Sequence, residues 1–126
     1  MTELETAFDD LEQRDSSKIA VLDIGSNSFH LVVVRIISGT VQTLHKIKQK
    51  VRLAEGLSEE GYLSEEAIRR GLDTLKYFEK SISGFEPDSV RIVATYALRS
   101  ARNSHKFIKA ARKIIRYPVE IISGQE

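Results

Sequence analysis

The chain has 126 residues, of which 41% are hydrophobic and 29% charged, and its formal net charge at pH 7 is +1. This composition is typical of one globular domain or part of one, and the small net charge gives no general reason to expect a nucleic-acid or membrane partner. The chain has no cysteine, which excludes disulfide bonds and thiolate zinc sites and fits a cytoplasmic location, and no apolar run approaches the roughly 20 residues that span a bilayer.

The first half of the chain predicts a flexible tail and then three strands. Residues 1–17 carry six acidic side chains and no apolar signal core, so we expect a flexible N-terminal tail. Two apolar, β-branched runs, Lys18–Ile24 and Ser28–Ile37, flank a small polar turn and predict an antiparallel hairpin. A second turn at Ser38–Thr40 and a third run, Val41 to about Arg52, complete a meander of three strands.

A long helix is expected next. Ser64 is a good N-cap, and the glutamates that follow it suit the first turn of a helix. Apolar residues then recur at spacings of three and four, which predicts one buried stripe; they are Ile68, Leu72, Leu75, Phe78 and Ile82. Gly84 is a natural C-terminal stop.

The last part of the chain predicts a strand at Val90–Thr95, a short helix at Tyr96–Arg102, a helix capped by Ser104, and a final strand at Val119–Ile122. The order of elements is therefore β-β-β-α-β-α-β. Helical crossovers between the later strands favour parallel pairing. The fold class expected is α/β, with a five-stranded mixed sheet and helices packed on it.

The turn between the first two strands has unusual content. Gly25 allows close approach of a ligand, and the amides and hydroxyls of Ser26, Asn27 and Ser28 can form a concave seat for an anion. Asp23, just before the turn, would repel a bare phosphate but suits a metal ion beside one. The same small polar residues also fit an ordinary hairpin corner.

Several cations allow two interpretations. Lys46, Lys48, Lys50 and Arg52 alternate with other residues, so period-two spacing places all four on one face of the third strand. They form either a solvated edge strand or a cationic track for an extended polyanion. Arg99 follows a strand-to-helix junction, where its planar fork could bind phosphate or simply face solvent. The other cations, on the outer face of the last helix, favour solvation; they are Lys106, Lys109, Arg112, Lys113 and Arg116.

Four segments resemble motifs of the exopolyphosphatase/guanosine pentaphosphate phosphohydrolase family, with the greatest likeness to its bacterial exopolyphosphatase branch. The hairpin Val21–Val32 resembles the opening phosphate motif of that family. The other matching segments are Val51–Leu57, Ala94–Asn103 and Glu120–Glu126. The resemblance as a whole extends over nearly everything after Lys18.

The resemblance implies an actin-like ATPase fold, related to ribonuclease H, of which residues 18–126 would form the N-terminal lobe. In that family the first hairpin, here Gly25–Ser28, binds phosphate, and the acid of the motif, here Asp23, helps to hold a divalent metal and the attacking water. Arg99 is expected to be a phosphate ligand. Glu126 matches the first glutamate of a Ser-Gly-x-Glu-Glu-Ala segment, and we expect the second glutamate to be the catalytic one.

The resemblance therefore predicts hydrolysis of the terminal phosphoanhydride bonds of inorganic polyphosphate, with Mg²⁺ or another divalent cation. Cleavage of guanosine pentaphosphate, an actin-fold kinase, and a non-catalytic module that binds polyphosphate or an alarmone stay open. The family pattern continues beyond Glu126, so we expect a longer parent enzyme that is a homodimer. Residues 1–126 alone are expected to turn over little substrate and to be prone to self-association.

Overall fold

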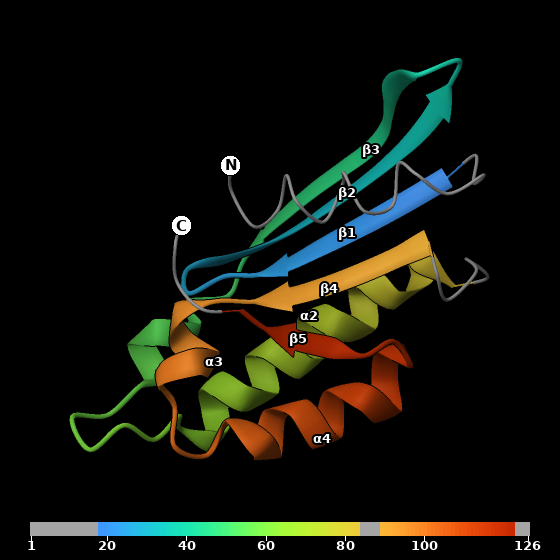
Figure 1. Ribbon diagram of the computed structural model, residues 1–126. Coiled ribbons are helices and arrows are strands. Elements are labelled where there is room, and N and C mark those ends of the chain that lie inside the picture. Colours follow the sequence, from blue (N-terminus) through green and yellow to red (C-terminus); the bar gives the residue numbers. More distant parts are fainter. Residues whose placement is uncertain (1–17, 84–88, 123–126) are drawn as a thin grey trace.

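The computed structural model describes residues 18–83 and 89–122. The expectations for the tail at residues 1–17, for Gly84 and for Glu126 lie outside the described residues. The rest forms one five-stranded mixed sheet in the order β3-β2-β1-β4-β5, with helices packed on it (Figure 1). The predicted α/β fold class is confirmed.

The five strands have both kinds of pairing. β1 (Lys18–Ile24), β2 (Ser28–Ile37) and β3 (Thr40–Lys50) form the antiparallel meander that the sequence predicts. β4 (Val90–Ala94) runs parallel to β1, and β5 (Val119–Ile121) runs parallel to β4. β1 is therefore the central strand, and β3 is an edge of the sheet.

The described residues also form four helical segments: η1 (Leu53–Gly56), a short 3₁₀ helix, and the α-helices α2 (Glu65–Ile82), α3 (Tyr96–Ser100) and α4 (Ser104–Ile115). α2 and α4 lie on the same face of the sheet (Figure 1). None of the described helices is both long and apolar enough to cross a membrane.

The main core lies between that face and the two long helices. Alternate residues of β1 and β2 point into it, because successive side chains of a strand face opposite sides. Fully buried residues of this core include Leu22, Ile24, Phe29, Leu31, Leu75, Phe78 and Phe107. The predicted stripe of α2 is confirmed, with Ile68 and Leu72 at its partly buried margin. Ile19, Val21 and Val34 form a second, smaller cluster on the opposite face.

The predicted N-cap is correct for α2 and wrong for α4. Ser64 caps α2 as predicted, since its hydroxyl accepts a hydrogen bond from the Ala67 amide at 3.1 Å. Ser104 was expected to cap α4 but is its first residue, and Asn103 occupies the N-cap position. The Asn103 side chain makes no capping bond, because it binds both backbone groups of Leu63, at 2.8 and 3.0 Å.

The third strand is shorter than predicted, and Arg52 is not part of it. The strand ends at Lys50, and Arg52 adopts a left-handed conformation with φ 57° and ψ 48°. The change of direction follows from the backbone, because the amides of Val51 and Arg52 both donate to the Asn27 carbonyl, at 2.9 and 2.8 Å. The chain thus wraps around the tip of the first hairpin instead of continuing the strand.

Candidate functional site

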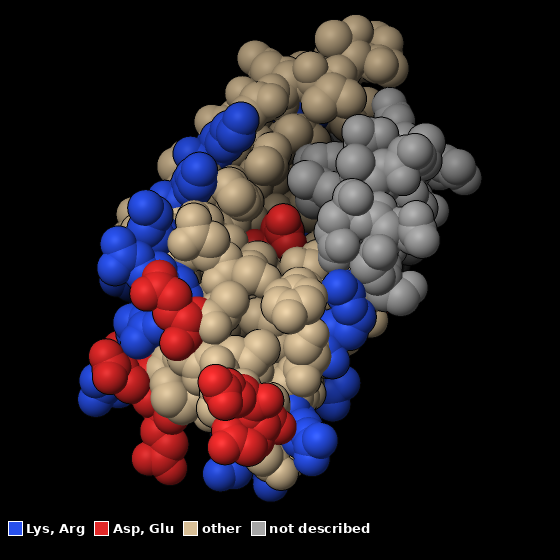
Figure 2. Space-filling view, turned by 90° about the vertical axis from the view of Figure 1, so that its left-hand side faces the viewer, with Lys and Arg blue, Asp and Glu red and all other residues tan. Residues whose placement is uncertain are grey.

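Three parallel strands end level with one another. Ile24 of β1, Ala94 of β4 and Ile121 of β5 are in register. The Thr95 amide donates to the Ile24 carbonyl at 3.4 Å, and the Ile122 amide donates to the Ala94 carbonyl at 3.0 Å. The turn after β1, the start of α3 and the segment after β5 therefore meet at one edge of the sheet. Open α/β sheets commonly bind ligands at this carboxyl edge. It faces the viewer in Figure 2.

The turn at this edge has its carbonyl groups directed to one side. The Asn27 carbonyl accepts from Val51 and Arg52, and the Ser26 carbonyl accepts from the Ala54 amide at 2.9 Å. A trans peptide group is planar and its N–H points opposite to its C=O. The amides of Asn27 and Ser28, which share those two peptide groups, therefore point away from the 51–54 segment. They form a pair of donors at the edge of the sheet.

The turn also has little room. The Gly25 amide donates to the Ser28 carbonyl at 3.2 Å, and a Cβ at Gly25 would lie only 2.6 Å from that oxygen. Within the described part of the chain, no bond runs back from the Ser28 amide to the Gly25 carbonyl. Ser28 is 5% exposed, and its Oγ has no hydrogen-bond partner among the described residues. A buried hydroxyl of this kind is uncommon and is well placed to bind a ligand.

The polar residues beside the turn share one face of the sheet. Asp23, His30 and Lys48 are paired across β1, β2 and β3, and Ser28 is paired with Lys50. This face is opposite α2 and α4, because the neighbouring residues in each strand point into the main core. His30 lies within the strand predicted at Ser28–Ile37, but its place between Asp23 and Lys48 was not predicted.

Three of the four cations predicted to share one face of the third strand do so. Lys46, Lys48 and Lys50 are exposed and alternate along edge strand β3. Arg52 lies beyond the strand, and its guanidinium is 3.5 Å from the Glu55 carboxylate. Figure 2 shows Lys and Arg side chains forming a band along one side of this end of the molecule. The α4 cations are exposed, as expected.

Arg99 lies at the same edge. Its Nη1 donates to the Ile122 carbonyl at 2.9 Å, just past the end of β5, and its guanidinium is 5.9 Å from the centre of the Tyr96 ring. The side chain thus spans the ends of β4 and β5. The structure brings this predicted phosphate ligand to the edge that carries the hairpin.

A metal ion would have few protein ligands in this part of the chain. Among residues 18–83 and 89–122, no three His, Asp or Glu side chains cluster around one position. Mg²⁺ is commonly held by one or two carboxylates, with water and phosphate oxygens as the remaining ligands. Asp23 is half-buried and lies one residue before the end of β1, next to the hairpin turn. It fits the role of one such carboxylate.

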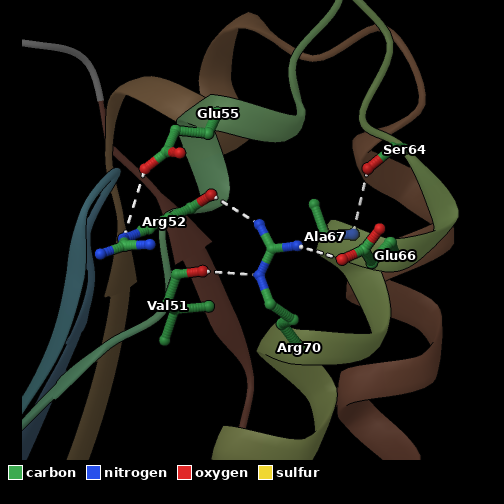
Figure 3. Close-up of polar contacts among 7 residues, drawn as sticks. All are labelled: Val51, Arg52, Glu55, Ser64, Glu66, Ala67 and Arg70. Carbon is green, nitrogen blue, oxygen red and sulfur yellow. Dashed lines mark hydrogen bonds and ion pairs between the residues drawn. The ribbon is translucent and has the colours of Figure 1, made fainter.

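Arg70 of α2 is a residue of the site region that the sequence did not single out (Figure 3). Its Nε donates to the Val51 carbonyl and its Nη2 to the Arg52 carbonyl, both at 2.9 Å, while Nη1 is 3.4 Å from Glu66. These carbonyls belong to the segment that braces the hairpin. No motif or spacing in the sequence marks this arginine.

An open hollow of about 600 Å³ lies around this bracing segment, with Lys50, Arg52, Glu55, Glu66 and Arg70 among its lining residues. Its cations are accompanied by acids, and the hairpin residues are not part of its lining. We therefore assign the candidate anion site to the hairpin amides and not to this hollow.

The fold defines a class: one lobe of the actin-like ATPase fold. The chain belongs to the Ppx/GppA phosphatase family, whose model matches residues 32–126. A protein of Haemophilus influenzae named "Putative exopolyphosphatase" is 49% identical over 108 residues, which are 86% of this chain and 33% of that protein.

Solved structures agree. An exopolyphosphatase from Cytophaga hutchinsonii matches with a TM-score of 0.79 and 36% identity, over 85% of this chain and 34% of that one. The Aquifex aeolicus PPX-GPPA enzyme matches with a TM-score of 0.76 and 31% identity, over 84% of this chain and 36% of that one. The chain thus spans about a third of the length of the relatives it matches.

Proposed function

We propose that the whole protein is an exopolyphosphatase, which hydrolyses the terminal phosphoanhydride bond of inorganic polyphosphate. Its family membership and the names of its relatives support a phosphatase of this class. The observation that carries the proposal is the orientation of the first hairpin. Its two carbonyls are turned toward residues 51–54, so its amides are left as donors at the ligand-binding edge of the sheet.

In this proposal the chain binds and orients the terminal phosphate. The amides of Asn27 and Ser28 and the buried Ser28 hydroxyl donate to its oxygens, and Gly25 keeps the turn narrow enough for close approach. Arg99 approaches from the β4–α3 junction. Phosphoryl transfer needs mainly positioning and dispersal of charge, and these donors supply both.

Asp23 is proposed to hold a divalent cation, Mg²⁺ or another. Without such a cation, the carboxylate would repel the phosphate bound beside it. Such a cation, when bound, neutralises charge that develops on the phosphate oxygens. Asp23 lies one residue before the end of β1, so its carboxylate can hold the cation next to the hairpin.

The cationic track is proposed to hold the rest of the polymer. Ser28 is paired with Lys50, and Lys48 and Lys46 follow at two-residue steps along the same face. A polyanion whose end is bound at the hairpin could therefore run along β3. The catalytic role of the segment containing Glu126, the homodimer and the cytoplasmic location stay predictions of the sequence.

The test is phosphate release by the whole protein from long-chain polyphosphate and, separately, from guanosine pentaphosphate. We expect release from polyphosphate that requires a divalent cation. Asp23→Asn should lower it about a hundredfold or more, the scale of losing a well-placed catalytic group. Asp73→Asn, which removes an exposed carboxylate from α2, is the matched control.

Cleavage of guanosine pentaphosphate without cleavage of polyphosphate would move the assignment to the sister activity of the family. Equal activity of the Asp23→Asn and Asp73→Asn variants would remove Asp23 from the site. Residues 1–126 alone should release little phosphate. Rapid turnover by this chain would contradict the proposal that it binds and orients the phosphate while hydrolysis needs the whole protein.

A further inference from the structure

We propose that Arg70, on the far side of the hairpin from the anion, is a positioning residue that acts on the Ser28 amide through two intervening peptide groups. Its charge orients and polarises the donor without touching the ligand. The inference rests on the proposed function for the identity of the anion, a polyphosphate end, and its test separates the two.

The contacts form an unbroken row. Arg70 Nε donates to the Val51 carbonyl at 2.9 Å, and the same peptide group carries the Arg52 N–H. That N–H donates to the Asn27 carbonyl at 2.8 Å, and the Asn27 peptide group carries the Ser28 N–H. Each peptide group is planar, so every dipole in the row points the same way. The row starts at a guanidinium and ends at the proposed anion site.

Such a row is polarised as a unit. Hydrogen-bonded groups in a low-dielectric setting strengthen one another, and a cation at the donor end increases the effect. Val51 is 3% exposed and its bond to Arg70 is part-buried, so water screens the first step less than it screens a fully exposed pair. A positive charge at one end and an anion at the other stabilise the same alignment of dipoles. The Ser28 amide therefore becomes a stronger donor than an isolated backbone N–H.

Arg70 also fixes the geometry of the row. Its Nη2 donates to the Arg52 carbonyl at 2.9 Å, so one guanidinium holds two successive carbonyls. Arg52 has a left-handed backbone, which residues with a side chain rarely adopt, and that conformation turns both carbonyls toward α2 (Figure 3). Glu66 is 3.4 Å from the third nitrogen of the guanidinium. Lysine could not reproduce this planar fork.

The first experiment uses the unchanged 126-residue chain, labelled with ¹⁵N, and titrates it with tripolyphosphate while amide and guanidinium protons are followed by NMR. The Ser28, Arg52 and Arg70 Nε protons should move downfield together, with the same apparent Kd. The Arg69 Nε proton, on an exposed side chain of the same helix, should stay in place. A shift confined to Ser28 would overturn the proposal.

The second experiment compares variants by calorimetry with tripolyphosphate. Arg70→Gln should weaken binding about tenfold, the scale of weakening one charged hydrogen bond, and Arg70→Lys should fall between it and the unchanged chain. Arg69→Gln removes the same charge from the exposed neighbouring position and should change affinity less than about twofold. The Arg70→Gln loss should fall less steeply with added salt than the effect of a fully exposed charge, because the part-buried row is screened less.

The outcomes are distinguishable. If tripolyphosphate moves no hairpin proton in the unchanged chain, the proposed phosphate site fails. If it moves Ser28 but neither Arg52 nor Arg70, the site stands and the role of Arg70 is refuted. Equal losses in Arg70→Gln and Arg69→Gln also refute it. The measurement on the unchanged chain decides the matter even if Arg70→Gln does not fold.

Discussion

The meander contains two hairpin turns of similar composition that are built in different ways. The distal turn, Ser38–Gly39, joins β2 to β3 with positive φ angles of 50° and 77°, as two-residue hairpin turns require. A Cβ at Gly39 would meet nothing within 4 Å. At the proximal turn, Gly25 has no positive φ, but its Cβ would lie 2.6 Å from the Ser28 carbonyl.

The two turns also differ in what surrounds them. The proximal turn receives three backbone hydrogen bonds from residues 51–54, and Arg70 holds that segment in turn. Around the distal turn, Ile37 and Val41 are each 52% exposed. Glycine thus serves backbone conformation in one turn and close approach in the other. A turn whose carbonyls are held by hydrogen bonds from another segment presents its amides in a fixed direction, which is the property that the proposed anion site requires.

The largest expected difference comes from replacing each glycine by alanine. Gly25→Ala should lower the free energy of unfolding by about 2 kcal/mol, because the new methyl group overpacks the turn. It should also weaken tripolyphosphate binding about tenfold or more, because the amides move. Gly39→Ala should cost about 1 kcal/mol for its left-handed backbone and leave binding unchanged. Urea denaturation and calorimetry measure both quantities.

This comparison would break if Gly39→Ala impaired tripolyphosphate binding as strongly as Gly25→Ala. The distal turn would then influence the site through β2 and β3, and the proximal turn would have no special claim as the anion site.

An intermediate effect is expected from the cationic track. Replacing Lys46, Lys48 and Lys50 by glutamine should weaken binding of long-chain polyphosphate about tenfold at low salt, since exposed ion pairs contribute about 0.5 kcal/mol each. The matched control replaces three exposed lysines of α4, namely Lys106, Lys109 and Lys113. Tripolyphosphate, held by the hairpin, should bind both triple variants nearly as well as the unchanged chain.

Titrations at several salt concentrations sharpen this prediction. The unchanged chain should lose affinity for long-chain polyphosphate more steeply with added salt than the β3 variant does, because fewer cations contact the polymer in the variant. Equal salt dependence of the β3 and α4 variants would show that polyphosphate responds to overall charge and not to the track.

Local patterns in the sequence determined most of the fold. Alternation and turn residues placed β1, β2 and the lysine face of β3 correctly, because those features depend on neighbours two residues apart. The Ser64 cap was equally local. The end of β3 at Lys50 and the left-handed backbone of Arg52 were not predicted. Both follow from hydrogen bonds to Asn27, which is distant in the sequence.

The site could be predicted only in outline, for the same reason. The hairpin residues and Arg99 stood out by type and position, but their roles remain predictions. The bracing contacts of Arg70 and the bonds between Asn103 and Leu63 join segments about 20 and 40 residues apart. No periodicity or motif marks such pairs, because they form only when the helices pack on the sheet.

The smallest expected effect is the most diagnostic of a site. Ser28→Ala removes a buried hydroxyl that has no partner among the described residues, so the free energy of unfolding should stay the same or rise slightly. Tripolyphosphate binding should weaken about fivefold, because the bound anion loses one donor worth about 1 kcal/mol. Ser100→Ala, at an exposed position of α3, should change neither quantity. If the hydroxyl stabilised the fold, its removal would lower both stability and affinity. If it binds only the ligand, its removal lowers affinity alone. A drop in stability of about 1 kcal/mol or more in Ser28→Ala would therefore count against the proximal turn as a binding site.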